Sequence, residues 1–180
     1  MKILFVAGTF DDNGGKPSGY MNKVVSEIQE TYFGKCEKFK IYNGGSWDKM
    51  LTEIFPKIAE LPEVIFWFAN IPNEKVKLVQ QIKTISPKSL LVISKNNMDG
   101  KYSVHYLVAK MLKLHANLML EIGGTSEKIL SSVYDPLGNC FAKDEDDTKS
   151  VALTLTARIC DIMNYNRIGS KCIGLSLIHI

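Results

Sequence analysis

The segment Lys2-Ile3-Leu4-Phe5-Val6-Ala7-Gly8 contains five consecutive apolar residues followed by a glycine. A short, wholly apolar run bounded by a turn residue is typical of a strand buried on both faces of a parallel sheet. Comparable runs recur along the chain, with amphipathic helical windows between them. This alternation predicts a single doubly wound α/β domain of the Rossmann-like or flavodoxin-like class, with helices on both faces of the sheet.

We expect about five parallel strands and an antiparallel hairpin at the C-terminal edge of the sheet. The predicted parallel strands cover residues 2–8, 37–42, 63–69, 89–94 and 117–122. The hairpin strands cover residues 128–134 and 140–143. Asp135 opens the turn between them and favours an Asx turn. Phe66, Trp67 and Phe68 in the third strand are predicted to be core residues.

Four helical windows lie between the strands, and a fifth follows the hairpin. The first covers residues 19–33. The second begins after Ser46, and the third follows Pro72 with Asn73 as its cap. The fourth is capped by Ser103, and the last covers residues 148–164, where the acidic stretch 144–147 suits the positive end of the helix dipole. The apolar faces of the second and fourth helices are Met50, Leu51, Ile54, Phe55 and Ile58, and Val104, Leu107, Val108, Met111 and Leu112.

Length and composition are those of one folded domain. The chain has 180 residues, of which 46% are hydrophobic and 23% are charged, as in ordinary soluble domains. We expect residues 1–165 to form one ligand-binding domain and residues 166–180 to be a tail. Residues 174–180 resemble a translated sequencing-adapter read-through, so we expect part of the tail to be non-native and assign no role to His179.

Charge, hydropathy and cysteine pattern exclude several classes of protein. The formal net charge is +3 without a basic run, so nucleic-acid binding is not indicated. No apolar run reaches the roughly 18 residues that a membrane-spanning helix needs. The four cysteines form no C-x-x-C pair, and no histidine has a partner at metal-ligand spacing. We therefore expect a reduced, cytoplasmic protein without a predicted metal site.

The loop after the first strand is the best candidate for phosphate binding. It contains Gly8, Thr9, Lys16, Ser18 and Gly19 before a helix begins. Such a loop can present backbone N–H groups and a helix N-terminus to an anion. It lacks the dinucleotide-binding and P-loop fingerprints. We favour phosphate or ribose binding here over a merely flexible loop.

Polar residues also follow the other strands. Asn43, Asn70 and Asn96 are candidate ligand contacts, although the segment that begins at Asn43 equally fits a plain helix-entry turn. Lys95 is the strongest single candidate for a phosphate contact. A solvent-facing Lys95 remains the alternative.

Two carboxylates are candidates for chemistry. Glu121 stands in an otherwise apolar run. It is a candidate general base, nucleophile or ribose-hydroxyl acceptor. Alternatively, it marks the point where the strand leaves the core. Asp11, beside Asp12, is a candidate for acid–base work or for holding Mg²⁺; the alternative is an ordinary polar loop, which commonly contains such a pair.

The opening Val6-Ala7-Gly8-Thr9, the helix entry Lys16-Pro17-Ser18-Gly19-Tyr20-Met21 and the position of Lys95 resemble phosphopantothenate–cysteine ligase, the synthetase half of coenzyme A biosynthesis flavoproteins. The hairpin and last helix are similar as well. The family's Asn-x-Ser-Ser-Gly segment is shortened to residues 16–19 here, and its Val-Ala-Asn strand end is replaced by residues 119–122. The resemblance implies a nucleoside triphosphate with Mg²⁺ and a homodimer that completes the crevice.

Three functions are compatible with these residues. In the first, the chain binds a phosphorylated nucleotide-type molecule for group transfer or ligation; Gly8, Thr9, Ser18 and Gly19 hold phosphate, Lys95 neutralises it, and Glu121 or Asp11 acts as base or nucleophile. In the second, the same crevice sequesters a nucleotide signal without turnover. In the third, Glu121 is the nucleophile of a glycosyl or deoxyribosyl transfer.

Overall fold

The computed structural model describes residues 1–10, 17–32, 36–41 and 47–167. Its centre is a seven-stranded sheet with the order β2-β1-β3-β4-β5-β6-β7. The strands are β1 (Ile3–Ala7), β2 (Cys36–Lys40), β3 (Val64–Phe68), β4 (Leu90–Asn96), β5 (Leu118–Gly124), β6 (Ile129–Tyr134) and β7 (Cys140–Glu145). The first five are parallel, whereas β6 and β7 run antiparallel to their neighbours. The predicted mixed α/β fold with a C-terminal edge hairpin is confirmed.

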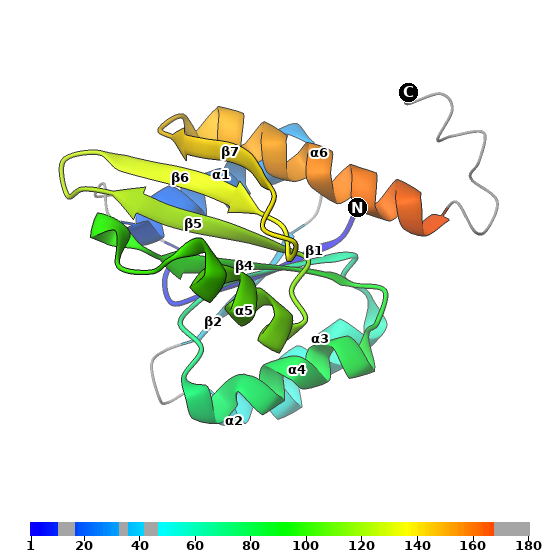
Figure 1. Ribbon diagram of the computed structural model, residues 1–180. Helices are drawn as coiled ribbons and strands as arrows, with labels where there is room; N and C mark the ends of the chain where they lie inside the picture. Colours follow the sequence, from blue (N-terminus) through cyan, green and yellow to red (C-terminus); the bar gives the residue numbers. More distant parts are fainter. Residues whose placement is uncertain (11–16, 33–35, 42–46, 168–180) are drawn as a thin grey trace.

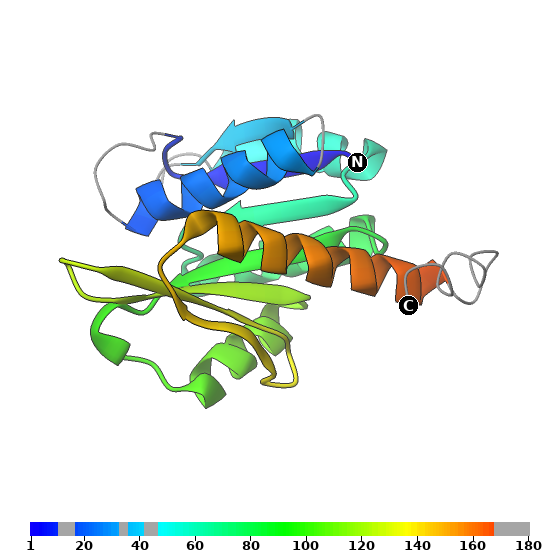
Figure 2. The ribbon, with the colours of Figure 1, turned by 90° about the horizontal axis from the view of Figure 1, so that it is seen from above.

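Helices cover both faces of this sheet (Figure 1). One face carries α1 (Pro17–Thr31) and α6 (Thr148–Arg167), which lie side by side when the molecule is viewed from above (Figure 2). The other face carries α2 (Trp47–Lys49), the π-helical η1 (Met50–Ile54), α3 (Phe55–Glu60), α4 (Val76–Ile85) and α5 (Val104–Leu114). Two short 3₁₀ turns, η2 (Asn73–Lys75) and η3 (Met98–Gly100), precede α4 and α5.

The central strands are apolar throughout because both of their faces are covered. Alternate residues of one strand point to opposite faces, so Leu4 and Val6 pack under α3 and α4, whereas Ile3 and Phe5 pack under α1 and α6. None of these four side chains is more than 2% exposed. The predicted core positions Phe66, Trp67 and Phe68 are likewise buried.

Strand order reverses between β1 and β3. From β1 the chain goes outward to β2, and then returns to the other side of β1 to form β3. In an open α/β sheet, the connections on either side of such a switch point leave the sheet toward opposite faces, which opens a crevice at the carboxyl ends of the strands. This switch point lies beyond Ala7 and Phe68, the last residues of β1 and β3.

Three strands, β4, β5 and β7, each end two residues later than we predicted. Lys95 and Asn96 are the last residues of β4, and Glu121 lies inside β5 and does not end it. The prediction was wrong because a polar residue was taken as the strand end. β6 continues the pairing of β5, so Glu121 lies opposite Ser132 on one side and Lys95 on the other.

The helical predictions need three corrections. Leu51 is 55% exposed, because the backbone widens into a π-helix just before Pro56, whose ring cannot fit a regular helix interior. Two predicted core-facing residues of α5 point outward as well: Val104 is 42% exposed and Leu112 is 59% exposed. Asn73 is not a cap: it begins the 3₁₀ turn η2, which has no side-chain cap at Pro72.

Polar side chains accept hydrogen bonds at three element ends, and two of them, Ser103 and Asp135, were predicted in this role. Ser103 Oγ accepts a hydrogen bond from Tyr106 N at the start of α5, and Asp147 Oδ1 accepts one from Lys149 N at the start of α6. Asp135 Oδ1 accepts hydrogen bonds from two backbone N–H groups of the hairpin turn. No helix within the described residues is long and apolar enough to cross a membrane. The predicted cap Ser46 lies outside the described residues.

Candidate functional site

A cleft of about 270 Å³ opens at the switch point of the sheet. It lies beyond the carboxyl ends of β1 and β3, beside the start of α1. Its lining residues are Gly8, Thr9, Ser18, Asn22, Ile41, Trp47, Phe68, Ala69 and Asn70. Four of them, Gly8, Thr9, Ser18 and Asn70, are residues that the sequence predicted as ligand contacts. The fold thus gathers them from three separate segments.

Backbone hydrogen bonds fix the rim of the cleft. Asn22, only 3% exposed, donates from Nδ2 to the backbone O of Thr9 at 2.9 Å, and the N–H of Ile41 donates to Ala7 O at 2.8 Å. These bonds tie the end of β1 to α1 and to the segment after β2. A Cβ atom at Gly8 would come no closer than 3.6 Å, to Ile41 O, so the fold itself tolerates alanine there. Glycine leaves its backbone open to the cleft.

The first turn of α1 faces this cleft through Ser18. Pro17 is the first residue of the helix, a position where proline is favoured because its missing N–H has no intrahelical acceptor. The other N–H groups of a first helical turn have no such acceptor either, and the helix dipole favours negative charge at this end. The first turn of α1 contains no acidic residue. This end of the cleft suits an anion.

Two largely buried aromatic side chains also contribute to the cleft lining. Trp47 lines the cleft and stacks on Trp67 of β3, with ring centroids 5.8 Å apart and an interplanar angle of 24°. Phe68 is 5% exposed and also contributes to the lining. Asn70 is exposed beside them. A ligand with both a charged group and a flat, partly apolar group matches this combination.

Lys95 belongs to a second group of residues, one strand further along the sheet. Its Nζ atom lies 4.5 Å from the ring centroid of Tyr102 and 5.7 Å from that of Tyr106. The two rings stack on each other with centroids 4.4 Å apart. Lys110 of α5 faces this group: burial lowers its pKa, and the positive charges of Lys95 and Lys113 lower it further. Lys95 is thus half-buried against aromatic rings and is not part of the cleft lining.

Glu121 faces the same side of the sheet as Lys95. Its Oε2 atom accepts a hydrogen bond from Asn97 Nδ2 at 3.0 Å. Burial raises the pKa of Glu121, while this hydrogen bond opposes the shift. Burial also raises the pKa of Tyr134 to about 12, and the charge of Glu121 adds to that shift. A carboxyl group whose pKa is shifted upward in this way is suited to proton transfer.

Asn97 organises this second group, and the sequence did not single it out. It is 4% exposed. Its amide accepts a hydrogen bond from Tyr102 N at 2.8 Å and donates to Tyr102 O at 3.0 Å, besides its bond to Glu121. Asn22 and Trp47 of the cleft were missed too. A polar residue that becomes buried through tertiary contacts leaves no periodic signal in the sequence.

The remaining predicted site residues lie elsewhere. Gly19 is a buried residue of α1 that lines a separate hollow with Tyr20 and Asp146. The Asn96 side chain is exposed and accepts a hydrogen bond from Met98 N at 3.2 Å, as a turn residue does. Asp11, Lys16 and Asn43 lie outside the described residues. The described residues contain no group of three or more His, Cys, Asp or Glu side chains that could hold a metal ion.

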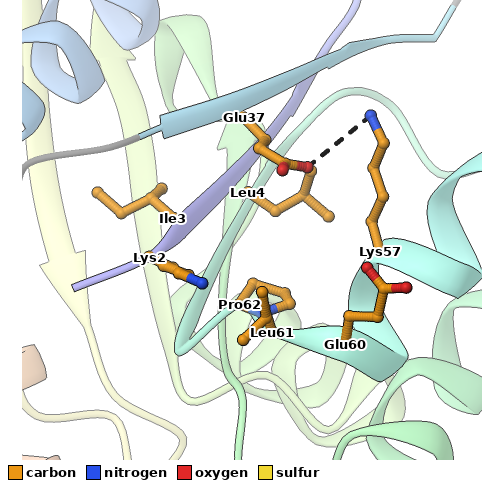
Figure 3. A pocket seen from close by; sticks show the side chains of 8 residues that line it. All are labelled: Lys2, Ile3, Leu4, Glu37, Lys57, Glu60, Leu61 and Pro62. Carbon is orange, nitrogen blue, oxygen red and sulfur yellow. Dashed lines mark ion pairs between the residues drawn. The ribbon is translucent and has the colours of Figure 1, made fainter.

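A smaller hollow of about 60 Å³ lies at the amino-terminal edge of the sheet. Figure 3 shows its lining, where the side chains of Lys57 and Glu37 point toward each other. Their Nζ and Oε2 atoms are 3.8 Å apart. Ligands of open α/β sheets bind beyond the carboxyl ends of the strands. The switch-point cleft is therefore the better candidate site.

Comparison with solved structures identifies the class of fold. A scan against protein-family models and a search of curated proteins each found no match. The structure of the DNA/pantothenate metabolism flavoprotein from Streptococcus pneumoniae superposes with a TM-score of 0.64 at 12% identity, over 89% of this chain and 98% of that one. The C-terminal domain of the coenzyme A biosynthesis bifunctional protein CoaBC superposes with a TM-score of 0.59 at 13% identity, over 88% and 93% of the two chains.

These matches establish a Rossmann-like α/β fold of the kind found in those flavoproteins. They also support the distant resemblance to the coenzyme A biosynthesis proteins that the sequence indicated. At identities of 12% and 13%, the likeness concerns the fold.

Proposed function

We propose that this chain binds a phosphorylated, nucleotide-type small molecule in the switch-point cleft and uses it in a ligase-like group transfer. The observation that carries the proposal is the composition of the cleft, where the N-terminus of α1, two hydroxyl side chains and an aromatic surface meet within about 270 Å³. Phosphate, sugar and base would each find matching chemistry there. The folds of the two structural neighbours, which by their names serve pantothenate and coenzyme A metabolism, support this choice.

In this proposal each cleft residue has a separate role. Ser18 and the backbone N–H groups of the first turn of α1 bind phosphate oxygens, and Gly8 lets the phosphate approach the backbone. Thr9 and Asn70 donate hydrogen bonds to sugar hydroxyls or to the base. Trp47 packs against the flat part of the ligand, held in place by its stacking on Trp67.

The second group lies within reach of a ligand that extends along the carboxyl edge of the sheet. β4 is the next strand after β3, and neighbouring strands are about 4.8 Å apart. A triphosphate spans more than one such interval. Lys95 would then neutralise a distal phosphate, and Glu121 would accept or donate a proton at the reacting group.

The nucleotide in this proposal is a nucleoside triphosphate with Mg²⁺, as the family resemblance implies. Mg²⁺ is usually held by substrate phosphates together with one or two carboxylates. Asp11, the candidate carboxylate, lies outside the described residues. Binding of the triphosphate is therefore the property of the cleft to test.

A thermal-shift screen tests the proposal directly. A ligand that binds only the folded chain raises Tm, by an increment that grows with its concentration relative to Kd. The panel contains nucleoside mono-, di- and triphosphates with and without Mg²⁺, cyclic nucleotides, NAD-type compounds and phosphopantothenate. We expect a shift with a nucleotide that Asn70→Ala reduces and that Asn73→Ala, an exposed asparagine outside the cleft lining, preserves. If no compound raises Tm, the proposal is refuted.

Turnover separates ligation from the two alternatives. A sequestering protein would bind the nucleotide and leave it unchanged, whereas group transfer consumes it. The half-buried Glu121 with its raised pKa favours an enzyme over a passive binder. In glycosyl transfer Glu121 would be the nucleophile, so Glu121→Gln abolishes the reaction; a transfer rate unchanged in this variant excludes that mechanism.

We also propose that the chain forms a homodimer through α5. Val104, Tyr106 and Leu112 of this helix are 42%, 43% and 59% exposed. The adjoining hairpin turn, whose Gly138 lies beside Val108 of the same helix, presents Leu137, which is 86% exposed. A second copy of the chain would cover these apolar side chains.

A further inference from the structure

Lys83 is a half-buried amine at the amino-terminal edge of the sheet, away from the cleft. It is in the last turn of α4, and its Nζ atom donates hydrogen bonds to Ser89 O at 2.6 Å and to Asn117 Oδ1 at 2.7 Å. Ser89 immediately precedes β4, and Asn117 immediately precedes β5. Lys83 therefore links the end of a helix to the starts of two strands.

The surroundings of Lys83 provide hydrogen-bond acceptors but no counter-charge. Among the described residues, no acidic side chain forms an ion pair with it. The acceptors are a backbone carbonyl and an amide, both neutral. An uncharged amine still has two hydrogens to donate, so it can keep both hydrogen bonds. The geometry accommodates the neutral amine, and its lone pair is then available for reaction.

The half-buried Lys83 borders a surface hollow of about 320 Å³. Lys83 lines this hollow with Gln80, Thr84, Pro87 and His115. His115 is the other titratable side chain in this lining. Gln80 donates to the backbone O of Lys113, which closes the α5 side of the region.

The charged groups nearest on the remaining side belong to a neighbouring hollow. It lies around the turn between α4 and β4, and its lining includes Glu60, Glu63 and Lys88. Ser89, whose carbonyl accepts from Lys83, also lines that hollow, but the three charged residues do not line the hollow of Lys83. None of these charges contributes to the lowered pKa of Lys83, for which burial is the cause.

We propose that Lys83 is a covalent modification site that takes an acyl group from a small activated acyl donor of the acyl phosphate class. The neutral Nζ attacks the carbonyl carbon, a C–N bond forms, the C–O bond to phosphate breaks, and inorganic phosphate leaves. The nitrogen loses one proton to water. The product amide keeps one hydrogen, so one of the two hydrogen bonds to Ser89 and Asn117 is lost, and the junction of α4 with β4 and β5 is loosened.

Burial supports this assignment, because it lowers the pKa of Lys83 to about 8. At pH 7.5 such an amine is about one-quarter uncharged, against about one-thousandth for an ordinary lysine. This advantage of roughly 200-fold is partly offset because a less basic nucleophile is intrinsically slower. Half-burial slows it further. We expect a net rate about tenfold above that of an exposed lysine.

Site-resolved labelling of the native chain tests the proposal. The protein is treated with acetyl phosphate between pH 7 and 10, and early acetylation of each lysine is quantified by peptide mass spectrometry. Lys77 and Lys88, which are exposed, are the internal comparators. We expect Lys83 to react about tenfold faster at pH 7.5 and its rate to level off above about pH 8.5. A rate at or below that of the comparators, or one that still rises at pH 10, overturns the proposal.

Asn117→Asp is the matched variant. Aspartate has the shape of asparagine, and its Oδ1 can still accept from Lys83 and from Leu91 N, 2.9 Å away in the native chain. It places a negative charge beside the amine, which favours the ammonium form. We expect acetylation of Lys83 at pH 7.5 to fall about tenfold while that of Lys77 is unchanged. Equal rates in folded variant and parent would contradict the proposal; if the variant does not fold, the pH profile of the native chain decides.

Discussion

Removing the Asn97 side chain tests how the second group of candidate site residues is held together. In Asn97→Ala, three hydrogen bonds are lost, two to the backbone of Tyr102 and one to the carboxylate of Glu121. Net contributions of about 1 kcal/mol for each neutral bond and about 2 kcal/mol for the charged one give a loss of about 4 kcal/mol in unfolding free energy. For a chain of this length, Tm should fall by about 12 °C.

The loss depends on pH in a defined direction. Burial raises the pKa of Glu121 in the folded chain above its ordinary 4.5. A folded-state carboxyl with a raised pKa binds its proton more tightly than the unfolded chain does, so stability falls as pH rises from 4.5 through the folded-state pKa. Asn97 reduces the upward shift of the Glu121 pKa, because it donates a hydrogen bond to the carboxylate. Its removal raises the pKa further, and the cost of Asn97→Ala should be about 1 kcal/mol larger at pH 8 than at pH 4.

Urea unfolding at the two pH values measures both quantities. Asn73→Ala, at an exposed asparagine without the contacts of Asn97, is the control and should be within about 0.5 kcal/mol of the parent at both. If Asn97→Ala costs less than about 1 kcal/mol, or costs the same at pH 4 and pH 8, then Asn97 does not stabilise the charged carboxylate and our account of this group is refuted.

Two further predictions concern a turn and an interface. Gly124 has φ +85°, and a Cβ there would collide with Lys128 O and lie 2.8 Å from Leu130 N. Gly124→Ala should therefore cost at least about 3 kcal/mol in unfolding free energy, measured by denaturant titration. Gly100→Ala, at φ +65° with open space around it, should cost about 1 to 2 kcal/mol. Equal costs would show that the collision is relieved without strain. Leu112→Lys, on the outer face of α5, should leave Tm nearly unchanged and convert the proposed dimer to a monomer in light scattering; a parent that is already monomeric at high concentration excludes the dimer.

The parts of the fold that follow from local pattern were predicted well from the sequence. The central strands are apolar on both faces, and this continuous signal located β1, β3 and β4 and their helical partners. The ends of β4 and β5 were not predictable in the same way, because pairing with β6 keeps Glu121 inside a strand. Leu51 and Leu112 fit helical periodicity but point outward, and periodicity alone does not say which strip of a helix meets the sheet.

The candidate site was predictable in its position but not in its internal contacts. A parallel sheet brings the ends of its strands to one edge, so Gly8, Thr9 and Asn70 were expected near one another, and the structure places them in one cleft. Asn22, Trp47 and Asn97 are held by tertiary contacts that sequence spacing does not reveal. The same limit explains why Lys95 and Glu121 lie in a second group, since their position follows from strand register.

The edge strands have a consequence for how this chain behaves at high concentration. β2 and β7 pair on one side only within the described residues, and an unpaired strand edge can recruit further chains into extended β-structure. On β2, Glu37, Lys38 and Lys40 are exposed, and the pairing of β7 with β6 is irregular. Charge and irregular register both hinder growth of the sheet from chain to chain. Both features disfavour the growth of fibrils from the edges of this sheet.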